Sequence, residues 1–370
     1  IMPVTKFTNL DFDQIKTQIK DYLRANSNFT DFDFEGSNFS VLIDTLAYNT
    51  YISAFNSNLV VNESFLDSAT LRENVVSLAR NIGYVPRSKT ASRASVSFDV
   101  TANSTSTEIR LQPGLVCVGR SNDSDVVFSI SEEIVASTTV TSGIATASFG
   151  SVSSPIDVLE GTFLTSQFVV DGSLDQRFIL DNANIDTSSI VAYVGSPGIR
   201  GKQYKLVDNI VGISSISDTY LIQEVQDERY ELLFGDGIFG RKPENGAVIT
   251  VQYVVTSGSE GNGPSHFNFA GSFLGDAGQV ITPSFTPTIN TIAPAANGGD
   301  IESIDSIKYF APRLYSSQYR AVTARDYESI VQQVYPNTET VSVVGGEEVD
   351  PPQFGTVLIT IKPKNGEFVS

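Results

Sequence analysis

Two different hydrophobic periods divide the chain. In residues 11–83, apolar side chains recur every three to four residues, which places them on one face of an α-helix. From Ala94 to about residue 260 the period changes to two, which is typical of half-buried antiparallel strands. Helical spacing returns near Ile301 and is followed by two strand-like runs. The pattern therefore predicts an α+β protein with several domains.

Four segments are expected from this pattern. They are a helical N-terminal region at 1–92, an antiparallel β-rich region of one or two domains at 93–260, a Gly-, Ser- and Pro-rich linker or arm at 261–300, and an α/β unit at 301–370. The last unit has two helices and two strands but no terminal element to complete it. We therefore expect it to be incomplete, as in a fragment or a short version of a longer protein.

Polar residues predict where several helices begin and end. In a capping box, two polar side chains three residues apart bind each other's backbone N–H groups at a helix start. Three such pairs occur in the helical regions: Asp11 with Gln14, Thr70 with Glu73, and Thr323 with Asp326. The helix after Thr70 should end at Gly83, because glycine favours the C-terminal end of a helix.

The helix predicted near residues 38–62 carries apolar side chains over a wide arc. Three short helices cannot readily cover so much apolar surface among themselves. A helix that is hydrophobic nearly all round is usually buried in a larger assembly. Two interpretations stay open: a small internal bundle, or a helix that docks against partner chains.

The charge distribution argues against binding to nucleic acid. The net charge is −18, and residues 93–300 hold 23 acidic and 10 basic side chains. Such a surface repels phosphate groups. The sequence also lacks a run of about 18–20 apolar residues, so no membrane-spanning helix is predicted, and its first residues do not resemble a secretory signal. We expect a soluble chain that binds neither nucleic acid nor membranes.

The sequence offers few residues for catalysis. Cys117 is the single cysteine, and the alternating run GLVCVG predicts that it is a small buried hydrophobe. His266 is the single histidine, and no serine lies in a G-x-S-x-G motif. Residues 31–36 (DFDFEG) match the start of a calcium-binding loop, but the twelfth position is Leu42 where a glutamate is needed. We predict no catalytic residue, no cofactor and no metal site.

The glycine-rich stretch YELLFGDGIFGRKPENG at 230–246 could be a phosphate-binding loop or a pair of turns. A phosphate-binding loop opens a helix. Here strand-like runs precede and follow the glycines. The stretch therefore predicts turns between strands, with Asp236 as a turn residue rather than a ligand.

Several runs resemble proteins of contractile phage tails. Residues 232–263 (LLFGDGIFGRKPENGAVITVQYVVTSGSEGNG) are similar to a signature segment of baseplate J-like proteins, as are residues 298–331, 335–338 and 345–363. Residues 61–100 (beginning VNESFLDSATLRENVV) resemble the helical start of the baseplate wedge protein of T-even-type phages. These segments occur in the family's order and cover most of the chain.

The resemblance implies a structural role in a virion. Members of this family form the inner ring of the tail baseplate, as a dimer within each of six wedges, after assembly in the host cytoplasm. They pack with other wedge proteins and transmit the conformational change that triggers sheath contraction. On this basis the core-bundle helices would be 38–62 and 65–82. The candidate partner-binding residues are Phe39, Leu42, Leu46, Ile52, Phe55, Leu59, Leu71, Val75, Leu78 and Ile82.

Two other functions remain as alternatives. The acidic β region could be a receptor- or ion-binding module on the virion surface. A tail-associated glycan hydrolase would need only two carboxylates about 5–10 Å apart in space. The chain differs from the family that it resembles in length, because wedge proteins of this type are much longer than 370 residues.

Overall fold

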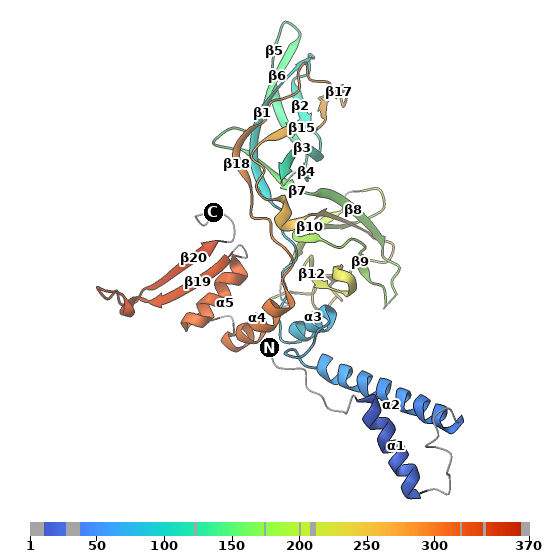
Figure 1. Ribbon diagram of the computed structural model, residues 1–370. Coiled ribbons are helices and arrows are strands. Elements are labelled where there is room, and N and C mark those ends of the chain that lie inside the picture. Colours follow the sequence, from blue (N-terminus) through green and yellow to red (C-terminus); the bar gives the residue numbers. More distant parts are fainter. Residues whose placement is uncertain are drawn as a thin grey trace. The chain divides into compact units, whose positions relative to one another are not determined.

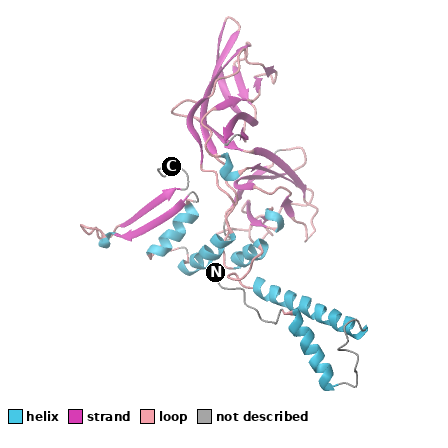
Figure 2. Ribbon diagram, in the orientation of Figure 1, coloured by secondary structure: helices cyan, strands magenta, loops and turns pink. Residues whose placement is uncertain are grey.

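The computed structural model shows a chain of two compact units (Figure 1). It describes residues 11–26, 38–121, 124–173, 175–199, 201–207, 212–318, 320–335 and 338–363. The helical unit comprises residues 1–85 and 304–316, and the second unit comprises residues 86–303 and 317–370. Helices make up the first unit, whereas strands dominate the second (Figure 2). The predicted α+β class, with helices first and a β-rich middle, is confirmed.

The helical unit begins as its capping signal predicts. Its helices are α1 Phe12–Asn26, α2 Asn38–Glu63, α3 Arg72–Asn81 and α4 Ile304–Ser317. At the start of α1, Asp11 Oδ1 accepts hydrogen bonds from the backbone N–H groups of Asp13 and Gln14. After α3, Gly83 has a φ of 82°, a left-handed conformation that glycine adopts at little cost. The predicted cap at Asp11 and the predicted end at Gly83 are therefore both confirmed.

The first β domain is an eleven-stranded sheet. Its strands are β1 Arg93–Asn103, β2 Glu108–Leu111, β3 Gly114–Ser121, β4 Ser124–Ile130, β5 Ile134–Thr141, β6 Ile144–Phe149, β7 Ile156–Glu160, β15 Phe267–Phe269, β16 Phe273–Gly275, β17 Val280–Ile281 and β18 Asn290–Ala296. The order is β15-β3-β4-β7-β1-β6-β5-β2-β16-β17, with β18 paired to β1. Alternate residues of β1 are buried, as a period of two predicts.

Cys117 lies in the core of the first β domain and is completely buried. This burial raises the pKa of its thiol to about 12. A thiol that stays protonated is a poor nucleophile. The prediction that Cys117 is a buried hydrophobe is confirmed.

The segment 261–300 differs from its prediction as a linker or arm. It contributes β15, β16, β17 and β18 to the sheet of the first β domain. β15 pairs with β3, β16 pairs with β2, and β18 pairs with β1. The linker interpretation is therefore wrong, because β15, β16 and β18 obtain their hydrogen bonds from strands that lie distant in the sequence.

The second β domain is a seven-stranded sheet inserted between β7 and β15. Its strands are β8 Thr162–Val169, β9 Phe178–Leu180, β10 Ile185–Gly195, β11 Lys202–Leu206, β12 Thr219–Glu224, β13 Tyr230–Phe234 and β14 Val248–Val255. The order is β8-β14-β10-β11-β12-β13-β9, and the pair β11–β12 is parallel. The domain has a core of its own, so residues 93–260 belong to two β domains.

The buried carboxylate of Glu160 joins the two chain segments that connect the β domains. The chain leaves the first β domain after Glu160 and returns to it after β14. Glu160 is only 2% exposed. The Glu160 carboxylate accepts hydrogen bonds from the Thr256 hydroxyl and from the Ser257 backbone N–H. The outgoing and returning strands are thus joined by charge-assisted hydrogen bonds.

The glycine-rich stretch forms turns, as predicted. Asp236 Oδ1 accepts the backbone N–H groups of Ile238 and Phe239, each at 2.8 Å. These hydrogen bonds lower the pKa of the Asp236 carboxyl. Gly237 and Gly240 have φ values of 94° and 88°, which non-glycine residues rarely adopt. The next regular element is the strand β14, so no helix follows the loop.

The C-terminal residues of the second unit form a helix and a hairpin. They are α5 Ala324–Val334, β19 Thr338–Gly345 and β20 Val357–Pro363. β19 and β20 pair antiparallel, and α5 packs against β19. The capping box of Thr323 and Asp326 is present at the start of α5, which confirms this sequence prediction.

Candidate partner-binding surface on helix α2

The side of α2 that is buried within the chain consists mainly of small and polar residues. Its buried residues are Ser40, Ile43, Ala47, Asn58 and Asn62. α1 packs against α2, and the Asn62 side-chain amide donates to the Asn58 carbonyl at 2.7 Å. An amphipathic helix normally buries its largest apolar side chains. On α2 that arrangement is reversed.

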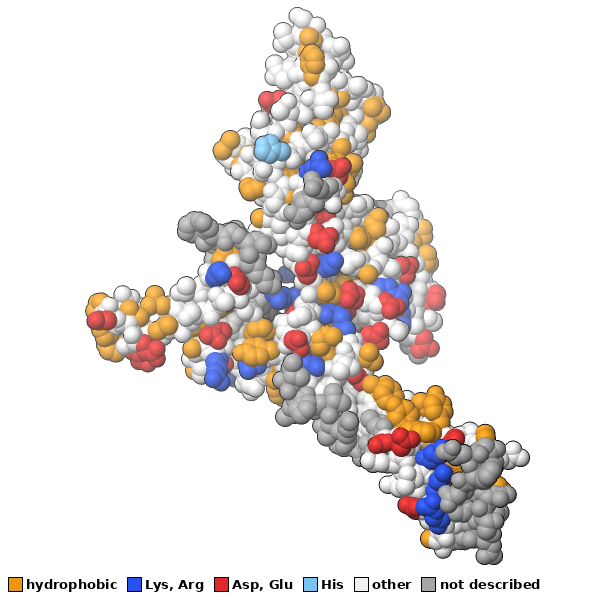
Figure 3. Space-filling view, viewed as in Figure 1, with side chains coloured by type: hydrophobic (Ala, Val, Ile, Leu, Met, Phe, Trp, Pro, Cys, Tyr) orange, Lys and Arg blue, Asp and Glu red, His pale blue; other side chains and the backbone are white. Residues whose placement is uncertain are grey.

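The large apolar side chains of α2 are exposed. Each of the following is at least 36% exposed: Phe39, Val41, Leu42, Leu46, Tyr48, Ile52, Phe55, Leu59 and Val60. Figure 3 shows hydrophobic side chains gathered on the helical unit, beside a row of basic side chains. An apolar surface of this extent on one element is typical of sites of protein–protein contact.

These residues form two stripes on different sides of the helix. The first apolar stripe is Phe39, Leu42 and Leu46. The second apolar stripe is Tyr48, Ile52, Phe55 and Leu59. Steps of three and four residues keep each stripe on one side, whereas the two-residue step from Leu46 to Tyr48 turns about 200° around the axis. Polar residues that include Thr45, Asn49 and Asn56 lie between the stripes, on the side opposite the buried residues.

The predicted partner-binding residues divide by exposure. Phe39, Leu42, Leu46, Ile52, Phe55, Leu59 and Leu71 are exposed. Leu78 and Ile82 are half-buried, and Val75 is completely buried within this chain. Val75 is therefore not available on the surface of this chain. Sequence reasoning missed Tyr48, although it lies four residues before Ile52 and so shares its side of the helix.

The connection between α2 and α3 differs from the predicted helix at 65–82. Residues 64–71 form turns, and α3 begins only at Arg72. The Glu63 carboxylate accepts hydrogen bonds from the Thr70 backbone N–H at 2.8 Å, from the Thr70 hydroxyl at 2.6 Å and from the Asn74 amide at 2.8 Å. We call this cluster the Glu63 clamp. It supplies the acceptor at the start of α3 that the sequence had assigned to the pair Thr70 and Glu73.

Replacing Glu63 by Gln should loosen the start of α3. Burial raises the pKa of Glu63, but hydrogen bonds from Thr70, Asn74 and Leu71 lower it more, so the net pKa lies below the usual value. The clamp therefore stabilises the fold above about pH 4.3, and this contribution is lost as the pH falls through the lowered pKa. We expect Glu63→Gln to lower the free energy of opening at α3 by about 1 kcal/mol at pH 7.

Amide hydrogen exchange along α3 measures this effect at pH 7. The matched control is Glu73→Gln, an exposed glutamate on α3 itself, which should leave exchange unchanged. Thermal melts of both variants should converge with the parent chain once the pH falls below the lowered pKa of Glu63. Equal effects of the two substitutions would show that the clamp does not exist.

The described residues bear on the predictions for a metal site, a membrane-spanning helix and His266. Among them, no group of three or more His, Cys, Asp or Glu side chains could hold a metal ion. In the same part of the chain, no helix is long and apolar enough to cross a membrane. His266 is exposed, and its Nδ1 lies 3.1 Å from the Ser265 hydroxyl. The stretch 31–36 lies outside the described residues.

Two protein families match the ends of this chain. Residues 11–84, which contain α1, α2 and α3, match the family described as "Baseplate wedge protein gp6-like, helical domain". Residues 323–370, which contain α5, β19 and β20, match "Baseplate structural protein gp6, C-terminal domain I". Both exposed stripes thus lie in a domain that a known family shares.

A characterised relative matches nearly the whole chain. It is the "Baseplate wedge protein gp6" of Enterobacteria phage T4, 28% identical over 385 aligned residues. The match covers 98% of this chain but 55% of the relative, so the chain spans about half of the relative's length. A chain of a solved structure, the cryo-EM baseplate of the anti-feeding prophage, is 13% identical to this chain. The alignment covers 94% of this chain and 68% of the baseplate chain. Its TM-score of 0.30 is too low to bear on the fold.

Proposed function

Since the chain belongs to the gp6-like baseplate wedge proteins, we propose that it is a structural subunit of a contractile-tail baseplate that assembles through α2. The family places it among the structural proteins of the virion. The finer role, assembly of the wedge and transmission of the change that triggers sheath contraction, rests on the surface of the helical unit.

The observation that supports this proposal is the reversed pattern of burial on α2. Leu46 is 56% exposed and Phe55 is 47% exposed, whereas Ala47 and Asn58 are buried. Exposure of large apolar side chains is unfavourable by about 25 cal/mol for each Å² of apolar surface. A chain that bears this surface is stabilised when partner helices cover it.

The two stripes favour more than one partner helix. One helix cannot cover two stripes about 160° apart around the axis, so α2 would lie inside a bundle with a neighbour on each side. We propose that one neighbour comes from another wedge protein and the other from a second copy of this chain, as a dimer within each of six wedges. No cofactor is needed for this role, because helix packing supplies the binding energy.

Transmission of a conformational change needs parts that can change their arrangement. The division of the chain into a helical unit and a β-rich unit supports such a role. In this proposal the bundle around α2 holds the wedge together, while the β domains of neighbouring subunits change their contacts. A non-enzymatic, mechanical function follows.

Co-expression with the other baseplate proteins of the same tail tests the proposal. We expect the chain to co-purify with at least one of them in a stable complex of fixed stoichiometry, measured by size-exclusion chromatography with light scattering. The chain alone should associate with itself or bind hydrophobic dyes, because its stripes are uncovered. A monomer that binds no dye and no baseplate protein would refute the proposal.

A further inference from the structure

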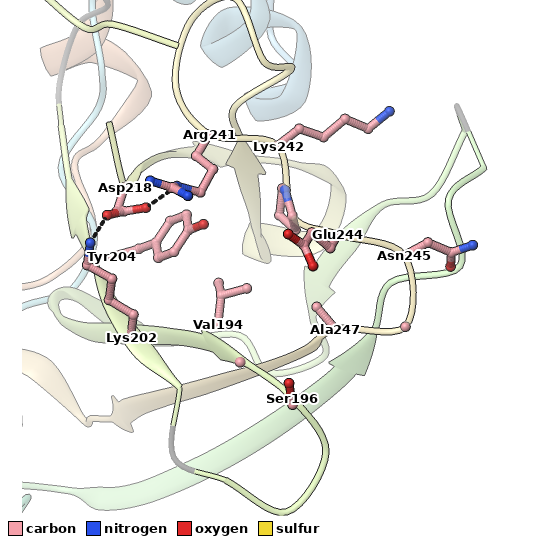
Figure 4. A pocket seen from close by; sticks show the side chains of 13 residues that line it. Val194, Ser196, Lys202, Tyr204, Asp218, Arg241, Lys242, Glu244, Asn245 and Ala247 are labelled. Atoms are coloured by element: carbon pink, nitrogen blue, oxygen red, sulfur yellow. Dashed lines mark ion pairs between the residues drawn. The ribbon is translucent and has the colours of Figure 1, made fainter. Parts of the chain in front are cut away.

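The second β domain contains a cavity that the assembly function does not use. Its volume is about 370 Å³, within the range of roughly 300–1,000 Å³ that small-molecule sites occupy. It is lined by the end of β10, by Lys202 and Tyr204 of β11, by Asp218, and by residues 241–246 of the glycine-rich stretch with Ala247 directly after it (Figure 4). We call it the Tyr204 pocket.

An ion network fixes one wall of the Tyr204 pocket. The Asp218 carboxylate pairs with the ammonium group of Lys202 and with Arg241 Nε, the latter at 2.7 Å. The hydrogen bond from Lys202 is the largest of the effects that lower the pKa of Asp218. The carboxylate therefore stays ionised and holds both cationic side chains in place. Each of these cations has further N–H groups that can donate toward the cavity.

Tyr204 supplies a buried polar group without a hydrogen-bond partner among the described residues. The residue is only 4% exposed, and its ring packs edge-on against Phe234 at 5.7 Å. Its hydroxyl makes no hydrogen bond with any residue that the structure describes. Burial raises its pKa, so the hydroxyl remains protonated. A buried tyrosine hydroxyl usually finds a hydrogen-bond partner, and here the cavity is the place for one.

One carboxylate of the pocket, that of Glu244, faces this hydroxyl. Figure 4 shows the Tyr204 ring between Arg241 and Val194, with its hydroxyl directed toward Glu244. Asp218 and Glu244 thus provide carboxylate oxygens, while Lys202 and Arg241 provide N–H donors. Lys242 also lines the pocket, but its ammonium group is directed away from Tyr204 (Figure 4). A simple anion in the pocket would be repelled by the carboxylates of Asp218 and Glu244. A simple cation would be repelled by Lys202 and Arg241. Neither matches the whole lining.

We propose that the Tyr204 pocket binds one unit of a saccharide, a neutral polyhydroxyl ligand. Each sugar hydroxyl can donate one hydrogen bond and accept others, so a ring of hydroxyls can satisfy donors and acceptors that lie side by side. The proposal does not depend on the packing of α2. It gives the acidic β region a binding function in addition to its structural role.

Saturation-transfer NMR on the full chain tests this inference. The probes are the methyl glycosides of glucose, galactose, mannose and N-acetylglucosamine, in which the methyl group stands in for the rest of a glycan. We expect at least one of them to receive saturation and to bind in the millimolar range. Tyr204→Phe and Glu244→Gln should each weaken this binding about tenfold, because each removes one partner of a hydrogen bond.

Matched controls separate binding from folding. Glu260→Gln changes an exposed glutamate outside the pocket and should leave glycoside binding unchanged. Thermal melts should show that Tyr204→Phe and Glu244→Gln remain folded. The inference is overturned if none of the four glycosides binds. It is also overturned if binding persists unchanged in both pocket variants, or if inorganic phosphate or acetate displaces the glycoside, which would indicate an anion site.

Discussion

Replacing Leu46 or Phe55 of α2 by Asp is expected to abolish assembly of the wedge complex without unfolding the chain. Leu46 belongs to the first apolar stripe and Phe55 to the second, and both are about half exposed in the chain alone. A surface substitution changes stability by only about 0.5 kcal/mol. In a bundle the same Asp would be an unpaired buried charge, at a cost of about 3–5 kcal/mol. Affinity should fall at least about a hundredfold.

The measurement is co-purification of each variant with its baseplate partners. Circular dichroism of the isolated chain would show whether its helices persist. The matched control is Asn49→Asp, which places the same charge on the polar side of the same helix. This control should assemble normally. If Leu46→Asp and Phe55→Asp also assemble normally, the stripes are not the partner-binding surface.

The two stripes should also be separable. If each meets a different neighbour, Leu46→Asp should remove one partner and Phe55→Asp the other. Loss of the same single partner from both variants would mean that one neighbour wraps around α2. Val75 is unsuited to this experiment, because it is completely buried within the chain and a charge there would disrupt α3 itself.

The sequence predicts the ends of helices well where the signals are local. Asp11, Gly83 and the pair Thr323 and Asp326 act on backbone groups within a few residues, and the structure confirms each of them. The Glu63 clamp could not be predicted in this way. Its acceptor lies seven residues before Thr70, so the bond depends on how the chain turns between two helices.

Exposure is the second property that periodicity cannot give. Val75 and Leu46 both fit a helical apolar stripe, yet one is buried and the other is exposed. The sequence shows that a side chain needs cover, but not which chain covers it. The Tyr204 pocket was missed for a related reason, because its lining comes from strands and turns that meet only in the folded sheet.

The misread segment 261–300 shows the same limit for strands. β15 and β16 have three residues each, which is too short for a period of two to be visible. Glycines and prolines around them are typical of loops. These strands are specified instead by their partners and by a few large side chains that enter the core of the first β domain.

Phe273 is the side chain on which this correction is best tested. It is 1% exposed, and its ring lies 5.0 Å from Phe269 and 5.4 Å from Phe149. Phe273→Ala should therefore leave a cavity in the core and lower the free energy of unfolding of the first β domain by about 3–5 kcal/mol. The melting temperature of this domain should fall by about 10 °C or more.

The control for this prediction lies in the same segment. Phe285 is 82% exposed, so Phe285→Ala removes an identical side chain without opening a cavity and should change stability by no more than about 0.5 kcal/mol. Differential scanning calorimetry of both variants gives the comparison. A linker would tolerate both substitutions equally. A large difference between the two melting temperatures would show that residues near Phe273 form part of the β core. Equal melting temperatures would show that the segment is an arm outside the core.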